Sequence, residues 1–133
     1  MSKQITRTSL RKEVMEHRGL SLLQFRTEWS GACQIISPAY EELSKSYTGM
    51  AGFFSIDVEQ EAGVEKEFGV QEFPTILFFR NGELVDHAIG LIPKNTLIAK
   101  IEQALISGGQ PSDTKLPGTL PADLPSVHTL TDR

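Results

Sequence analysis

Cysteine is nearly absent from this chain. Cys33 is the only cysteine among 133 residues, so an intramolecular disulfide is excluded. Small secreted domains usually carry several cysteines, and residues 1–7 lead into no apolar signal core. We therefore expect a protein that works in a reducing compartment, the cytoplasm.

Long apolar runs and basic clusters are also missing. The longest apolar stretches, such as residues 76–79, are far too short to cross a bilayer, so we expect no membrane partner. The formal net charge is −4 and no basic run is interleaved with aromatics, which argues against nucleic acid as a partner. The sequence has no His/Cys cluster at zinc spacing, no EF-hand loop and no phosphate-binding glycine loop. We therefore expect no metal and no cofactor.

What the chain does contain suits one globular domain. Hydrophobic residues make up 39% and charged residues 23%, which are ordinary proportions for a chain that buries a core without staples. From residue 108 onward, prolines punctuate a Ser/Thr/Gly/Asp-rich segment that cannot bury enough surface to offset its ordering entropy. The sequence predicts a domain over residues 1–107 and a flexible Pro/Ser/Thr-rich C-terminal tail over residues 108–133.

Hydrophobic periodicity predicts four helices, two buried strands and a hairpin. The turn of the hairpin is Asn81-Gly82, because both residue types adopt positive φ readily. Pro38 lies inside a helical pattern and is expected to kink that helix. Strands that alternate with helices imply a parallel pair, and the hairpin adds antiparallel strands, so a mixed sheet covered by helices follows. In chain order the predicted elements are helix 9–17, strand 20–25, helix 32–47, strand 50–58, helix 61–68, hairpin strands 75–79 and 84–89, and helix 94–106.

Two of the predicted helices have a clear apolar side. For helix 32–47 the apolar residues are Ile35, Ile36, Ala39, Tyr40 and Leu43, and for helix 94–106 they are Leu97, Ile98, Ile101 and Leu105.

The acidic residues that surround the short helix 61–68 are expected on a solvated face, where they need no special role.

Five features of the sequence resemble the thioredoxin family. Residues 23–33, Leu-Gln-Phe-Arg-Thr-Glu-Trp-Ser-Gly-Ala-Cys, are similar to the family's strand and active-site motif. Pro38 matches the proline that kinks the active-site helix, and residues 69–75 resemble the segment that holds the family's cis-proline. Residues 79–83 resemble the hairpin turn, and Gly90 matches a glycine after the last strand. The resemblance covers residues 9–106 and implies an α/β thioredoxin-like fold, with a central mixed β-sheet flanked by helices on both faces.

Four departures from the family pattern concern its chemistry. Ser30 stands at the position of the family's nucleophilic cysteine, and Ala32 replaces the proline between the two cysteines. Gln24 stands where many members bury an aspartate, and Ser55 stands where the lysine neighbour of that aspartate would be. The resemblance implies that this aspartate and lysine help proton transfer during disulfide exchange. Because a glutamine side chain does not titrate, that role is missing here.

Ser30 has two interpretations. It precedes a helix, where a serine hydroxyl accepts a hydrogen bond from an amide two or three residues on, so it is a candidate helix cap. The alternative is a retained contact with a bound peptide. Nucleophilic catalysis by Ser30 would need a histidine and a carboxylate beside it, and we do not expect His17, His87 or His128 to reach it.

Cys33 stands at the position of the family's second cysteine, one turn into the helix and less exposed than Ser30. The helix dipole favours a thiolate there, whereas burial disfavours it. The thiol is therefore either an inert packing group or a reactive monothiol that forms mixed disulfides or is oxidised. Both alternatives stay open at the level of sequence.

The resemblance also implies a peptide-binding groove, formed by Trp29, Gly31, Ala32, Phe73 and Pro74. The family places the proline in cis, and the backbone at Phe73 then has a free edge for an extended peptide. Trp29 would supply apolar contact area. In the alternative interpretation, Pro74 only sets the turn and Trp29 only covers the core.

The leading hypothesis is an atypical monothiol thioredoxin-like protein in redox homeostasis or substrate holding, without dithiol reductase activity of its own. Its expected partners are protein or peptide thiols and disulfides, with glutathione as an alternative small thiol, and we expect a monomer or weak dimer. A second hypothesis is a thiol–disulfide oxidoreductase, in which Ser30 replaces a natural cysteine or Cys33 works with an external thiol. A third is a redox-inert adaptor or holdase.

Overall fold

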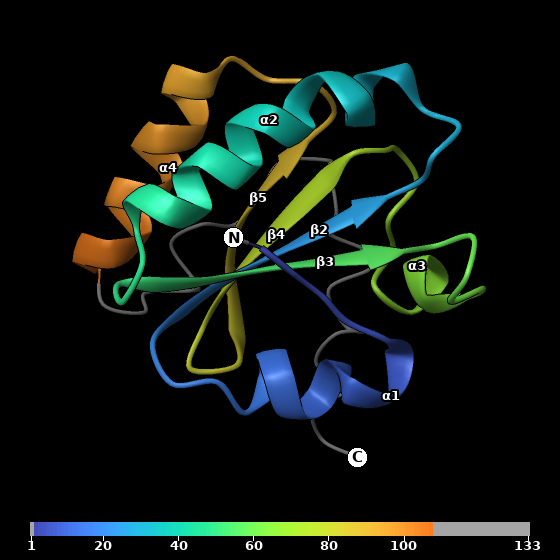
Figure 1. Ribbon diagram of the computed structural model, residues 1–133. Helices are drawn as coiled ribbons and strands as arrows, with labels where there is room; N and C mark the ends of the chain where they lie inside the picture. The colour runs from blue at the N-terminus through green and yellow to red at the C-terminus, as the bar shows by residue number, and fades with distance from the viewer. Residues whose placement is uncertain (1, 108–133) are drawn as a thin grey trace.

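A computed structural model describes residues 2–107 of the chain (Figure 1). The tail predicted for residues 108–133 lies outside the described residues. The ordered elements are β1 Lys3–Gln4, α1 Arg7–Leu10, η1 Arg11–Met15, β2 Leu20–Arg26, α2 Gly31–Ser46, β3 Ala51–Asp57, α3 Val64–Glu67, β4 Thr75–Arg80, β5 Glu83–Ile89 and α4 Lys94–Ser107.

The strands form one mixed sheet in the order β1-β3-β2-β4-β5. β2 pairs in parallel with β3 and antiparallel with β4, so it lies at the centre of the sheet. Helices α2 and α4 cover one face, whereas α1 and α3 lie against the other (Figure 1). This is the α/β thioredoxin-like fold that the sequence predicts.

Side chains of β2 alternate between the two faces of the sheet. Leu20 and Leu22 belong to the apolar cluster under α2 and α4, whereas Leu23 and Phe25 belong to the cluster under α1 and α3. Successive side chains of a strand point to opposite faces, so a strand covered on both faces of the sheet is expected to be mostly apolar. Ser21 and Gln24, which are both buried, are the polar exceptions in the buried part of β2, and Gln24 lies on the α2/α4 face.

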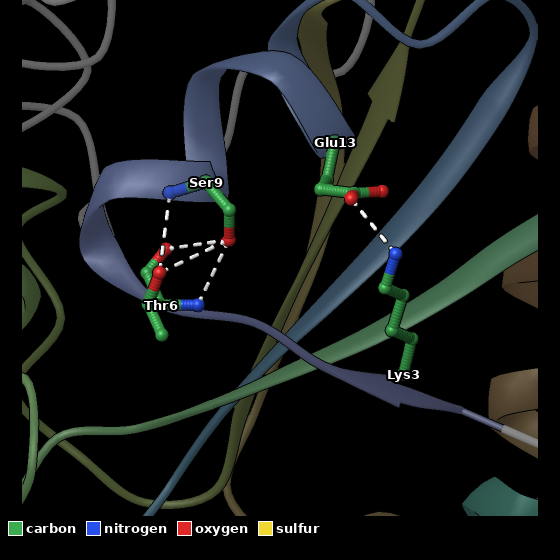
Figure 2. Close-up of polar contacts among 4 residues, drawn as sticks. All are labelled: Lys3, Thr6, Ser9 and Glu13. Carbon is green, nitrogen blue, oxygen red and sulfur yellow. Dashed lines mark hydrogen bonds and ion pairs between the residues drawn. The ribbon is translucent and has the colours of Figure 1, made fainter.

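The first helix begins earlier than predicted. Thr6 caps it by accepting a hydrogen bond from the Ser9 amide at 3.2 Å, while the Ser9 hydroxyl accepts one from the Thr6 amide at 3.0 Å (Figure 2). Lys3 pairs with Glu13 at 2.8 Å and joins β1 to the helix that follows. The last turn, η1, is a π-helix in which the Glu16 amide donates to the Arg11 carbonyl at 2.9 Å.

The prediction for residues 61–68 is too long, because α3 contains only Val64–Glu67. Gly63 has φ of +91°, a left-handed conformation that does not continue a helix, so residues 58–63 form turns instead. The prediction that Ile35 lies on the apolar side of α2 is also wrong, since its side chain is 65% exposed. Adjacent residues on a helix point about 100° apart, and the buried stripe runs through Cys33, Ile36, Tyr40 and Leu43.

Tyr40 fixes α2 over the sheet. Its hydroxyl lies 2.7 Å from the Phe54 carbonyl of β3 and 3.1 Å from the Leu22 carbonyl of β2. Burial raises the pKa of Tyr40, so the hydroxyl keeps its proton and acts as a donor. These contacts hold the middle of α2 over β2 and β3.

His87 is expected to make the fold less stable in mild acid. It lies on β5, opposite Leu77, and its buried Nδ1 has no partner among residues 2–107. Burial lowers the pKa of His87 below 6.5, an effect that Asp86 opposes and Lys100 reinforces. The unfolded chain therefore binds more protons, so stability is full above 6.5 and falls as the pH drops through the folded pKa.

The measurement is urea unfolding at a series of pH values for the natural chain and for His87→Leu. The histidine contribution to the pH dependence should disappear in the variant, while contributions from carboxylates remain. Two curves that fall in parallel as the pH decreases would contradict the assignment to His87.

Candidate functional site

The residues that carry the sequence motif meet at one end of the sheet. Ser30 and Cys33 begin α2 directly after β2, beside the turn through Phe73 and Pro74 that leads into β4. The connecting loop is held from within, because the Ser30 amide donates to the Thr27 carbonyl at 3.3 Å. The site therefore lies on short, hydrogen-bonded connections between core elements.

Ser30 is the N-cap of α2. Its hydroxyl oxygen accepts a hydrogen bond from the Cys33 amide at 3.2 Å, as the cap interpretation predicts. The same hydroxyl donates to the Phe73 carbonyl at 3.3 Å, a contact that the sequence did not indicate. Both bonds link the helix start to the turn before β4, so the hydroxyl has a structural role.

The histidines within the described residues lie away from Ser30. His17 packs edge-on against Phe54 and lies next to Gly52, near the start of β3. His87 shares the α1/α3 face of the sheet with its partner Leu77. His128 lies outside the described residues. The geometry of residues 2–107 therefore brings no imidazole to Ser30 as a general base.

Cys33 is completely buried, whereas Ser30 is half-exposed, in the order that the sequence predicts. The thiol points to the packed side of α2, on the same stripe as Ile36 and Tyr40. A thiolate must contact a disulfide sulfur in line to attack it, so the sulfur needs access. In this conformation Cys33 offers none.

Gln24 and Ser55 lie side by side beneath the helix layer. They are direct partners in the parallel pairing of β2 with β3, and both are buried. The Gln24 Nε2 has no hydrogen-bond partner in the part of the chain that the structure describes. Neither side chain titrates, so this pair does not relay a proton.

In the turn before β4, the main chain is more available to a binding partner than the side chains are. The Phe73–Pro74 peptide bond is cis, Pro74 is buried, and the Phe73 ring packs against the cluster under α1 and α3. The Pro74 carbonyl accepts a hydrogen bond from the Gly90 amide at 2.7 Å, which brings Leu91 to the same end of the molecule. Phe73 can therefore meet a partner chiefly through its main chain.

Trp29 is the most exposed large hydrophobic residue described, at 84%. The interpretation that Trp29 covers the core is therefore wrong. Gly31 is exposed and Ala32 half-buried next to it, and Leu91 is 49% exposed. We call Trp29, Gly31, Leu91 and the Phe73 backbone the Trp29 surface. Sequence reasoning missed Leu91, although the match at Gly90 was a signal for its position.

Two further classes of site find no support within residues 2–107. No group of three or more His, Cys, Asp or Glu side chains is placed to hold a metal ion there. None of the helices described is long and apolar enough to cross a membrane.

Comparisons with known proteins agree with the fold. A family profile described as Thioredoxin matches residues 1–103. A thioredoxin of Rickettsia felis is 33% identical over 105 residues, covering 79% of this chain and all of the relative. A thioredoxin of Staphylococcus saprophyticus is 37% identical over 87 residues, covering 65% of this chain and 84% of the relative. The chloroplastic thioredoxin M-type of Spinacia oleracea is 33% identical over 98 residues, covering 74% of this chain and 54% of that protein.

Proposed function

Because this chain belongs to the thioredoxin family, whose role is thiol–disulfide exchange with protein substrates, we propose that it binds such polypeptides without reducing them alone. The partner is held on the Trp29 surface, and the chain serves redox homeostasis by holding its partner. Two features together carry this proposal: Ser30 stands at the start of the helix, and Cys33, which is the only thiol of the chain, is buried.

The number of thiols limits the disulfide chemistry that this chain can perform. Reduction of a disulfide needs one thiolate to attack and a second thiol to resolve the mixed disulfide. With Cys33 alone, a mixed disulfide would wait for a thiol from outside the chain. The Ser30 hydroxyl does not replace the missing sulfur, since it is far less acidic than a thiol and is held by Cys33 and Phe73.

Binding, in contrast, needs no sulfur. An exposed tryptophan provides a large, rigid apolar contact, and a backbone edge pairs with an extended peptide. Trp29 is exposed next to the Phe73 backbone, and Leu91 adds apolar area beside them. These features support a surface that retains substrate affinity after loss of the attacking cysteine.

The test is insulin reduction with dithiothreitol as the electron donor. The natural chain is expected to give no turnover above the background of the reductant, whereas Ser30→Cys is expected to give turnover. The reason is that the new sulfur would stand at the exposed helix start, with Cys33 one turn behind it to resolve the mixed disulfide.

Ser46→Cys is the matched control, because it adds a second thiol at the exposed far end of α2. It should remain at background. Turnover by the natural chain would overturn the proposal in favour of an oxidoreductase. An inactive Ser30→Cys that still binds peptide would assign a further defect to Gln24 and Ser55.

A further inference from the structure

Three acidic residues lie on three different connections at the end of the sheet that carries the Trp29 surface. Glu28 follows β2, Glu59 follows β3 and Glu72 precedes the turn into β4, and all three are exposed. The two parallel strands finish at this end of the sheet and β4 begins there. Residues more than 40 positions apart are thus collected at one edge.

Glu59 is tied to the backbone of Trp29 through one hydroxyl. The Thr27 hydroxyl donates to Glu59 Oε2 at 3.1 Å, and the Trp29 amide donates to the same hydroxyl oxygen at 3.3 Å. The Glu59 amide is itself held by Asp57 Oδ1 at 2.8 Å. These bonds hold the exposed carboxylate near the main chain of Trp29.

Glu72 stands on the opposite side of the surface. Its carboxylate lies close to Gly90, since a Cβ built there would be 3.9 Å from Glu72 Oε1. Its carbonyl accepts a hydrogen bond from the Thr75 hydroxyl at 2.7 Å, which anchors the residue just before Phe73. Glu72 thus borders Leu91 and the Phe73 backbone.

No basic side chain of residues 2–107 pairs with these three carboxylates. The ion pairs described elsewhere use Lys3, Arg7, Lys94 and Lys100 with other acids. Lys94, at the start of α4, forms an ion pair with Glu42 at 2.6 Å. Arg26, which ends β2, is half-buried and is in none of these ion pairs.

These observations define an apolar centre with a negative border. Charges within about 8 Å act on a bound chain before salt screens them. An aromatic ring also attracts a cation over its face. A like charge brought to the same border would be repelled, and such repulsion is how a surface selects among partners.

We propose that the Trp29 surface selects an extended polypeptide in which lysine or arginine flanks an apolar residue. This inference rests on the proposed function and adds the class of partner. The apolar side chain packs on Trp29 and Leu91, the peptide backbone pairs at Phe73, and the cationic side chains meet Glu28, Glu59 and Glu72. Acidic segments are rejected at the same place.

The probes are three synthetic peptides that share a Ser-Ile-Phe-Ser core and carry lysines, serines or glutamates on both sides. Trp29 is the only tryptophan of the chain, so its fluorescence reports binding directly. We expect the lysine peptide to bind roughly tenfold more tightly than the glutamate peptide at low salt, with the serine peptide between them. High salt should bring the three affinities together.

A triple variant, Glu28→Gln, Glu59→Gln and Glu72→Gln, should lose most of this preference while it keeps the affinity for the serine peptide. The matched control is Glu16→Gln with Glu83→Gln, two exposed acids at the opposite end of the sheet, and it should keep the preference. Equal binding of all three peptides by the natural chain would overturn this inference alone. Binding of none of them would overturn the proposed function as well.

Discussion

Gly82→Ala is expected to lower the free energy of unfolding by about 3 kcal/mol or more. Gly82 has φ of +84°, a conformation that alanine rarely adopts. In addition, a Cβ at this position would lie 2.2 Å from the carbonyl oxygen of Met15, the last residue of η1. The backbone strain and the collision with Met15 both raise the free energy of the folded variant. Neither can be relieved by rotating a side chain, because both involve main-chain atoms and the Cβ.

The neighbouring backbone has little freedom to move. The Asn81 amide donates to the Gly19 carbonyl at 2.9 Å, and the Gly19 amide donates to Asn81 Oδ1 at 2.7 Å. These two bonds clamp the hairpin turn onto the segment after η1. Relief of the collision would separate the turn from η1 and lose both bonds, each worth about 1 kcal/mol.

Gly49→Ala is the matched control. Gly49 has the same φ of +84°, but a Cβ there would meet nothing within 4 Å. It should cost about 1 kcal/mol, the conformational part alone. Urea unfolding followed by far-ultraviolet circular dichroism measures both variants, and equal losses would show that the Met15 contact carries no weight.

The same turn shows what sequence can and cannot predict. The preference of Asn81-Gly82 for positive φ belongs to the two residues themselves and predicts the turn, and both angles are positive in the structure. Its docking on Met15 is a contact between distant segments and has no local signal. β1 was missed for the same reason, since its two residues become a strand only by pairing with Phe54 and Ser55.

In the candidate site, too, local features are predictable from the sequence and contacts between distant segments are not. The cap at Ser30 and the burial of Cys33 follow from their places at the start of a helix, so position in the sequence predicts them. The bond from Ser30 to Phe73 and the contact of Thr27 with Glu59 join segments 43 and 32 residues apart, and Glu72 meets Gly90 from the next connection. Such contacts depend on strand order, which periodicity alone does not determine.

Cys33 is expected to react with an aromatic disulfide reagent at least about 1,000-fold more slowly in the native protein than in denaturant. The side chain is completely buried, so the reagent must wait for an opening of the structure. A domain with about 5 kcal/mol of stability is unfolded in roughly one molecule in 5,000. Local opening at the start of α2 costs less than global unfolding, which is why the expected protection is somewhat smaller.

Two variants identify the event that exposes the thiol. The double variant Cys33→Ala, Ser46→Cys places the only thiol on the exposed end of α2 and should react at nearly the same rate with and without denaturant. Ser30→Ala removes the cap on Cys33, a loss of about 1 kcal/mol, and should speed the native reaction roughly fivefold. That acceleration would show that the opening that exposes the thiol breaks the Ser30 cap.

The outcome decides between the two interpretations of the thiol. If labelling is slow and becomes faster when the Ser30 cap is removed, Cys33 meets a partner sulfur only after the start of α2 opens. The natural complex is then held by the Trp29 surface and not by a covalent bond. Native labelling as fast as in denaturant would mean that the sulfur is accessible in the folded chain. A monothiol that captures its partners through a mixed disulfide would then be the correct description.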